Sequence, residues 1–162
     1  MPAIQYWFTG GALAAFVAVL ATISTLGFSW YRAAVTEMES ANSRLASEVH
    51  RLKSEQVKGL LGKVMTSGLA LLKELNSKDE DQADHEAATW GTNARDLIAA
   101  AYGDGEAILF FSDSGYTFFS DGSGKSKIRN WIDGRMRRIT ELLPRTDTLG
   151  IRETFDPAKF NR

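Results

Sequence analysis

The chain has 162 residues and a formal net charge of −1. Its length leaves room for one small domain beside a membrane segment, but not for two ordinary domains. It contains no cysteine, which excludes disulfides, thiolate metal sites and a cysteine nucleophile. Its two histidines, His50 and His85, are far apart and lack the spacing of a metal site. We therefore expect no metal and no other cofactor.

Charge is distributed unevenly along the chain. Residues 73–106 contain three basic and nine acidic side chains, whereas residues 125–152 contain eight basic and three acidic ones. The two stretches either face each other or meet different partners. Because the chain as a whole is not basic and has no recognisable nucleic-acid-binding motif, we expect no nucleic-acid partner.

An uncharged, mostly apolar run covers residues 7–30, with a tryptophan at each end. A helix that crosses a bilayer needs about 20 apolar residues, and aromatic side chains commonly lie at both membrane interfaces. A cleaved signal peptide would need a positive N-terminal region and a shorter apolar core. No Lys or Arg precedes Arg32. We therefore predict a retained, single-pass transmembrane anchor over residues 1–31.

The orientation of the anchor follows from its flanking charges. Basic residues occur only on its C-terminal side, beginning with Arg32, Arg44, Arg51 and Lys53. The positive-inside rule then places the N-terminus outside and the C-terminal domain on the cytoplasmic side.

Small residues recur every four positions within the predicted span. One series contains Gly10, Ala14, Ala18 and Thr22, and a second pair contains Gly11 and Ala15. This spacing places them on one helix face, where small side chains let helices approach closely. Small residues are also common in spanning helices generally. We interpret the series as a helix-packing surface for another subunit or a second copy.

An extramembrane helical rod is predicted over residues 32–76. Its apolar stripe contains Ala34, Met38, Ala41, Leu45, Val49 and Leu52. The spacing averages nearer 3.6 than 3.5 residues, which does not support a strict heptad seam. A short coiled coil and packing onto a neighbouring subunit both fit the stripe. Further along, Gly59, Gly62 and Gly68 allow either a bend or the close approach of another helix.

A small α+β domain is predicted over residues 77–144. Helical periodicity marks residues 82–102 and 126–143, with Ser77 as a candidate cap for the first helix and Pro144 ending the second. Between them, residues 107–111 and 116–120 read as a β-hairpin around a turn at 113–115. The predicted fold is thus mostly α, with a helix, hairpin, helix cap. Residues 145–162 form an irregular docking tail whose anchors are Phe155 and Phe160.

A short glycine motif at residues 121–126 lies between a predicted strand and a predicted helix. Gly122, Gly124, Lys125 and Ser126 are weak candidates for binding an anion at a helix N-terminus. A phosphate-binding P-loop also requires a glycine at position 119, which is Phe119. A glycine turn with Ser126 as helix cap explains the motif more simply.

The last predicted helix carries four arginines, Arg129, Arg135, Arg137 and Arg138. They form a solvated face that balances the acidic stretch, or they contact anionic lipid headgroups or a partner protein.

These patterns predict a non-catalytic membrane protein rather than an enzyme. The preferred function is an accessory, scaffolding or assembly subunit of a larger membrane complex, with membrane lipid and other subunits, or further copies, as partners. The alternative is a membrane-tethered sensor or regulatory module whose hairpin domain binds a small ligand or lipid. Phosphate or nucleotide binding at 121–126 is the third hypothesis.

Overall fold

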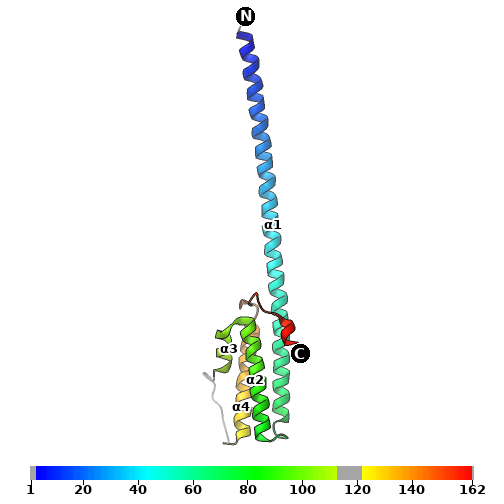
Figure 1. Cartoon of the computed structure of the whole chain (residues 1–162), viewed down its shortest axis with the longest axis vertical. Helices are drawn as coiled ribbons and strands as arrows, with labels where there is room; N and C mark the ends of the chain where they lie inside the picture. Colours follow the sequence, from blue (N-terminus) through cyan, green and yellow to red (C-terminus); the bar gives the residue numbers. More distant parts are fainter. Residues whose placement is uncertain (1–2, 113–121, 162) are drawn as a thin grey trace. The chain divides into compact units, whose positions relative to one another are not determined.

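The computed structural model describes residues 3–112 and 122–161, with side chains from residue 14 onward. The chain divides into two compact units, Met1–Glu48 and Val49–Arg162. The described elements are α1 (Ala3–Glu74), α2 (Glu80–Tyr102), α3 (Asp104–Phe111), α4 (Gly124–Leu142) and two 3-10 turns, η1 (Leu143–Arg145) and η2 (Pro157–Phe160). In the second unit, the C-terminal part of α1, α2 and α4 lie alongside one another (Figure 1).

Helix α1 continues without a break for 72 residues, which confirms the predicted long N-terminal helix. It passes through all three glycines of its C-terminal part. A Cβ added at Gly59 or Gly62 would meet nothing within 4 Å, but one added at Gly68 would lie 2.8 Å from Trp90 Cζ2. The close approach of another helix is therefore the correct interpretation at Gly68.

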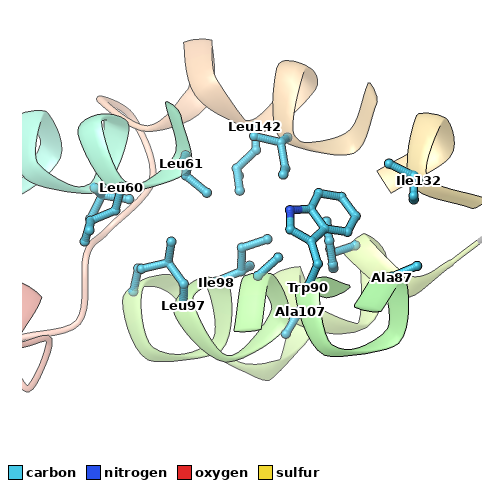
Figure 2. Packing of buried hydrophobic residues seen from close by; sticks show 14 of the residues in the cluster. Leu60, Leu61, Ala87, Trp90, Leu97, Ile98, Ala107, Ile132 and Leu142 are labelled. Carbon is cyan, nitrogen blue, oxygen red and sulfur yellow. The ribbon is translucent and has the colours of Figure 1, made fainter. Parts of the chain in front are cut away.

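The core of the second unit is built around Trp90 of α2. Its side chain is 6% exposed, and its indole N–H donates a hydrogen bond to the Val64 carbonyl at 2.9 Å. The Trp131 ring of α4 meets it edge-on at a centroid distance of 6.2 Å. Figure 2 shows Leu61, Ile98 and other apolar side chains converging on the same space from α1, α2 and α4.

The predicted β-hairpin is wrong, because the described residues contain no strand and residues 107–111 belong to α3. Gly103, with φ 99°, reverses the chain, and acidic Asp104 and Glu106 occupy the first turn of α3. Ala107 and Phe110 are buried three residues apart, whereas Ile108 and Leu109 are exposed. This one-sided burial is helical, and the described part of the cap is all-α. The predicted second strand, 116–120, lies outside the described residues.

Both helix caps differ from the predicted ones. Asp79 caps α2 by accepting a hydrogen bond from the Gln82 N–H at 2.8 Å, while Ser77 donates its hydroxyl to Glu74. Ser123 caps α4 by accepting from the N–H of Ser126 at 3.1 Å. A cap must have extended backbone immediately before the first helical turn, and Asp79 and Ser123 both do.

The C-terminal tail packs onto its own bundle. The Arg152 N–H donates to the Ala101 carbonyl at 2.9 Å, and Lys53 donates to the Glu153 carbonyl at 3.0 Å. Phe155 is 4% exposed and stacks on Phe160. The compact unit therefore runs from Val49 to the end of the chain, and it includes the tail and the last part of the stretch described above as a rod.

Candidate membrane segment and interaction surfaces

Helix α1 is long and apolar enough to cross a membrane, and no side chain in its most apolar window is buried. A bilayer offers no water, so polar groups in a span must be satisfied internally. The hydroxyl groups in this part of α1 meet that requirement, since each donates to a backbone carbonyl three or four residues earlier at 2.8–2.9 Å: Thr22 to Ala18, Ser24 to Leu20, Thr25 to Ala21 and Ser29 to Leu26.

The predicted small-residue surface lies on α1. Ala14, Ala15, Ala18 and Thr22 are helical and exposed, and Thr22 turns its hydroxyl to the helix backbone. Gly10 and Gly11 are helical, but their surroundings are outside the description. Packing of this surface against another helix stays a prediction.

Apolar side chains remain exposed on α1 beyond the predicted span. Met38 and Leu45 are 65% and 64% exposed. In the second unit, Val49 and Leu52 are also exposed, whereas Val57 and Leu61 of the same helix are fully buried. The bundle therefore covers Val57 and Leu61 of α1 and leaves Val49 and Leu52 exposed.

The glycine motif has structural contacts. The Lys125 ammonium donates to the carbonyls of Asn76 and Lys78, in the connection between α1 and α2. A Cβ at Gly124 would overlap the Glu80 carboxylate, which therefore lies against the start of α4. Gly122 has φ 84° and Asp121 is outside the described residues. A neighbouring carboxylate and an engaged lysine disfavour a bound anion, so anion binding at Gly122, Gly124, Lys125 and Ser126 stays a prediction without structural support.

The four arginines of α4 occupy different environments. Arg129 and Arg137 are exposed, and Arg138 pairs with Glu141 at 3.3 Å. Arg135 is only 2% exposed, and its Nη2 donates to the Phe111 carbonyl at 2.7 Å. Arg135 is thus part of the core and is not available to a lipid headgroup.

The core role of Arg135 was missed because it was grouped with the other arginines by charge. Its position provides the signal that could have identified it. Ile128, Ile132 and Ile139 are buried on one face of α4, and Arg135 falls between them at the same three- and four-residue spacing.

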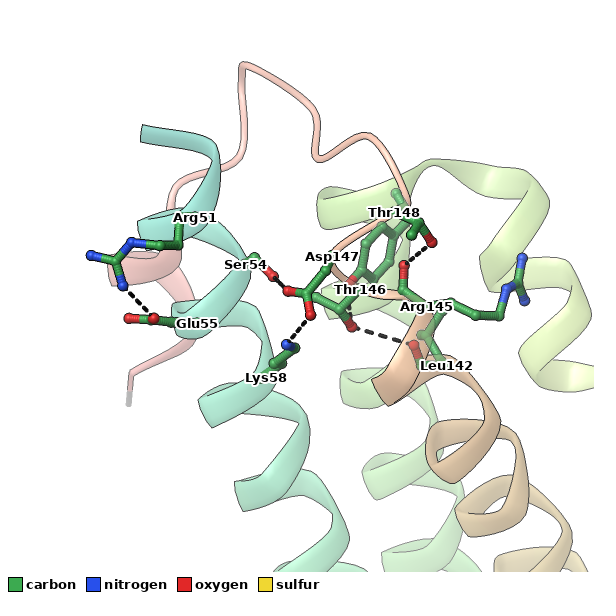
Figure 3. A network of polar contacts seen from close by, with 10 residues as sticks. Arg51, Ser54, Glu55, Lys58, Leu142, Arg145, Thr146, Asp147 and Thr148 are labelled. Atoms are coloured by element: carbon green, nitrogen blue, oxygen red, sulfur yellow. Dashed lines mark hydrogen bonds and ion pairs between the residues drawn. The ribbon is translucent and has the colours of Figure 1, made fainter. Parts of the chain in front are cut away.

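A polar network at the end of α4 was not predicted (Figure 3). The Asp147 carboxylate accepts hydrogen bonds from Lys58 and Ser54, both at 2.6 Å, and these bonds lower the pKa of Asp147. The Tyr102 hydroxyl donates to the buried Thr146 hydroxyl at 3.0 Å, and burial raises the pKa of Tyr102. These contacts join the segment after α4 to α1 and α2.

A second ion-pair cluster lies at the other end of the bundle. Lys78 contacts the carboxylates of Glu74 and Glu86, and these hydrogen bonds raise the pKa of Lys78. The Lys78 hydrogen bond also lowers the pKa of Glu86. Both clusters join separate parts of the fold, and their shifted pKa values follow from those contacts.

An open groove of about 520 Å³ lies between α2 and α4. Three carboxylates and one amine line it, so its charge would suit a cationic ligand. The lining residues are Glu80, Asp81, Asp84, Ala87, Ala88, Gly124, Lys127, Ile128 and Trp131. The described residues contain no cluster of His, Cys, Asp and Glu side chains arranged to hold a metal ion.

Comparisons with known proteins identify no family. No protein-family model matches the chain, and no curated protein or solved structure matches it significantly.

Proposed function

We propose that the protein is a non-catalytic, single-pass membrane protein that acts as an accessory or scaffolding subunit of a larger membrane complex. The observation that carries this proposal is the set of exposed apolar side chains on α1 beyond the apolar span, including Met38 and Leu45. Exposed apolar side chains are unfavourable in water, and a continuous row of them along a helix is typical of an interaction surface. A partner that covers this row would remove the cost.

The titratable groups support a structural role for the second unit. Among the described residues, four have shifted pKa values, and each of them bonds to a side chain of the same bundle: Lys78, Glu86, Tyr102 and Asp147. Shifted pKa values are common at catalytic sites, but structural ion-pair networks produce them as well. Here the shifts are explained by contacts that hold helices together.

In this proposal the N-terminus lies outside and the C-terminal unit is cytoplasmic. The absence of basic residues before Arg32 supports this orientation. Of the four arginines of α4, Arg129 and Arg137 are exposed, and lipid headgroups or a partner could reach them.

The location is tested by fractionating cells that express the full chain. We expect the chain in the membrane fraction, resistant to alkaline carbonate, with an intact N-terminus by mass spectrometry. Protease added from the cytoplasmic side should digest the C-terminal unit. A carbonate-soluble chain, or one cleaved after the apolar run, would overturn the membrane-anchor proposal.

The subunit role is tested by purification in mild detergent. The wild-type chain should elute as part of an assembly, and Leu45→Glu should reduce that assembly because it places a charge in the apolar row. Ser47→Glu is the matched control, since Ser47 is two residues away and bonds to its own helix at Ser43. A monodisperse lone wild-type monomer would contradict the proposal.

The second candidate function is a membrane-tethered module that binds a small ligand, and the acidic groove between α2 and α4 favours it. A thermal shift assay of the full chain with spermidine as a cationic probe tests it. Stabilisation that is lost in Asp84→Asn would support ligand binding, whereas no stabilisation would leave only the scaffolding proposal.

A further inference from the structure

Helix α1 contains an uninterrupted seven-residue repeat that the stripe of Ala34 and Ala41 conceals. If Val35 and Asn42 are counted as members of the repeat in place of Ala34 and Ala41, successive members are alternately four and three residues apart. The members of this seam are Ala14, Val17, Ala21, Ser24, Phe28, Tyr31, Val35, Met38, Asn42, Leu45, Val49 and Leu52. None is charged, although seven charged residues occur between positions 32 and 53. Such a repeat produces a left-handed coiled coil.

We propose that this seam binds a second copy of the chain as a parallel, in-register, two-stranded coiled coil that begins inside the membrane. The inference rests on the proposed membrane location for the direction of the two chains. Two copies inserted with the same orientation are necessarily parallel. The residues of the seam favour a second copy as the occupant.

The residue types outside the apolar run favour two strands. The seam alternates β-branched Val35 and Val49 at the a positions with Leu45 and Leu52 at the d positions, which is the combination that two-stranded parallel coiled coils prefer. Asn42 takes the intervening a position. In a parallel pair, each Asn42 faces its own counterpart, and a single such asparagine specifies register and two strands.

The flanking charges are complementary to the same chain. Glu48 is at a g position and Lys53, five residues later, is at the following e position. In a parallel pair these positions face each other, so each Glu48 meets the other copy's Lys53. Lys53 also donates to the Glu153 carbonyl, and an ammonium has three donors, so both contacts are compatible. The remaining e and g residues from 34 to 46 are alanines and Glu39, which bring no like charges together.

Within the apolar run, the seam contains three small residues beside the larger Val17 and Phe28. Ala14, Ala21 and Ser24 are on the seam, and the Ser24 hydroxyl is already bonded to the Leu20 carbonyl. The large exposed side chains at outward positions are Phe16, Val19, Ile23, Leu26 and Trp30. Small side chains permit close helix packing in lipid, and large ones face the acyl chains.

The two seam residues of the second unit, Val49 and Leu52, are not buried by the bundle. Val49 and Leu52 are 51% and 47% exposed, whereas Ser54, Val57 and Leu61 are buried. Pairing through the seam therefore removes no contact from the core.

Cysteine scanning of the full chain in its membrane tests the pairing, because the chain has no cysteine of its own. We expect Asn42→Cys, Leu45→Cys and Val49→Cys to form disulfide-linked dimers on mild oxidation, at several times the yield of the controls Ser43→Cys and Ser47→Cys. The linked product should have twice the mass of one chain. Equal yields at seam and control positions, or cross-links only to another protein, would overturn the proposal.

Charge reversal provides an independent test. Glu48→Lys or Lys53→Glu should each lower the Val49→Cys dimer yield, by roughly threefold given the usual strength of exposed ion pairs. The double reversal should restore it. Lys53→Glu also removes the bond to Glu153, but that loss persists in the double variant, so recovery reports the pair between chains. No recovery would contradict the parallel register.

Carbonate extraction of the same samples separates this inference from the proposed function. Seam-specific dimers of a carbonate-soluble chain would uphold the pairing and overturn the membrane location. A membrane-embedded chain without seam-specific dimers would overturn the pairing and leave the membrane location standing.

Discussion

The guanidinium of Arg135 lies 4.9 Å from the centre of the Trp131 ring, inside the bundle. The same group is 5.4 Å from the Phe111 ring centre and donates to the Phe111 carbonyl, where α3 ends. One cation thus holds α3 against α4 through a hydrogen bond and a cation–π contact, both with Phe111, while its contact with Trp131 lies within α4.

Arg135→Ala should lower the free energy of unfolding of the second unit by about 2–4 kcal/mol, because it leaves a cavity and a buried carbonyl without its donor. Arg137→Ala, on the exposed side of α4, should change it by less than about 0.5 kcal/mol. Denaturant titration of the full chain in detergent, followed by tryptophan fluorescence, measures both. Equal effects would show that Arg135 is not a core residue.

Two glycines in helix interiors should respond in opposite directions to alanine. Gly91→Ala should destabilise the fold, because its Cβ would overlap the Trp131 ring. Gly62→Ala should stabilise it by up to about 1 kcal/mol, because its Cβ meets nothing within 4 Å and alanine favours a helix. Thermal unfolding monitored by circular dichroism tests the pair. A gain in stability from Gly91→Ala would contradict the packing of Trp131.

Asp147 should contribute to stability at neutral pH and lose its contribution in acid. Its pKa is lowered in the fold, so the contribution is present above the unfolded pKa of about 3.9 and disappears as pH falls through the folded value. Asp147→Asn should lower the thermal midpoint at pH 7 and converge with wild type at low pH. Glu153→Gln, on an exposed turn, is the control and should follow wild type throughout.

Tyr102 should ionise later than an ordinary tyrosine. Burial raises its pKa, so the stability linked to its neutral phenol is present below about pH 10 and is lost as pH rises through the folded value. Absorbance at 295 nm follows the four tyrosines of the chain. Tyr102→Phe should remove a component that titrates above the ordinary tyrosine pKa of about 10, and removal of a component at the ordinary pKa would show that Tyr102 is solvated.

Lys125→Ala should lower the free energy of unfolding by about 1–2 kcal/mol, because the ammonium donates to the carbonyls of Asn76 and Lys78. The decrease should be the same with and without phosphate. Lys127→Ala, at an exposed position, controls for general charge effects. Phosphate or nucleotide that stabilises wild type but not Lys125→Ala would instead establish an anion site.

Most of the accurate predictions were based on the helical periodicity of apolar residues. The helices expected over 82–102 and 126–143 are Glu80–Tyr102 and Gly124–Leu142 in the structure. A helical period of apolar residues over about 20 positions predicts a helix reliably. The prediction was wrong at 107–111, because a short apolar run fits a buried strand or a buried helix equally well. There, the chain reversal at Gly103 and the burial of only one side of the run make residues 107–111 a helix.

The long apolar helix, its continuation beyond the apolar run and the periods of α2 and α4 could all be determined from the sequence, because each depends on residues a few positions apart. The burial of Arg135 against Phe111, the Ser54–Asp147 bond and the docking of Phe155 were decided only by the tertiary structure. The two bonds join residues 24 and 93 positions apart. The pattern of neighbouring residues cannot predict such pairs, because they form only when the helices pack and buried polar groups need hydrogen-bond partners.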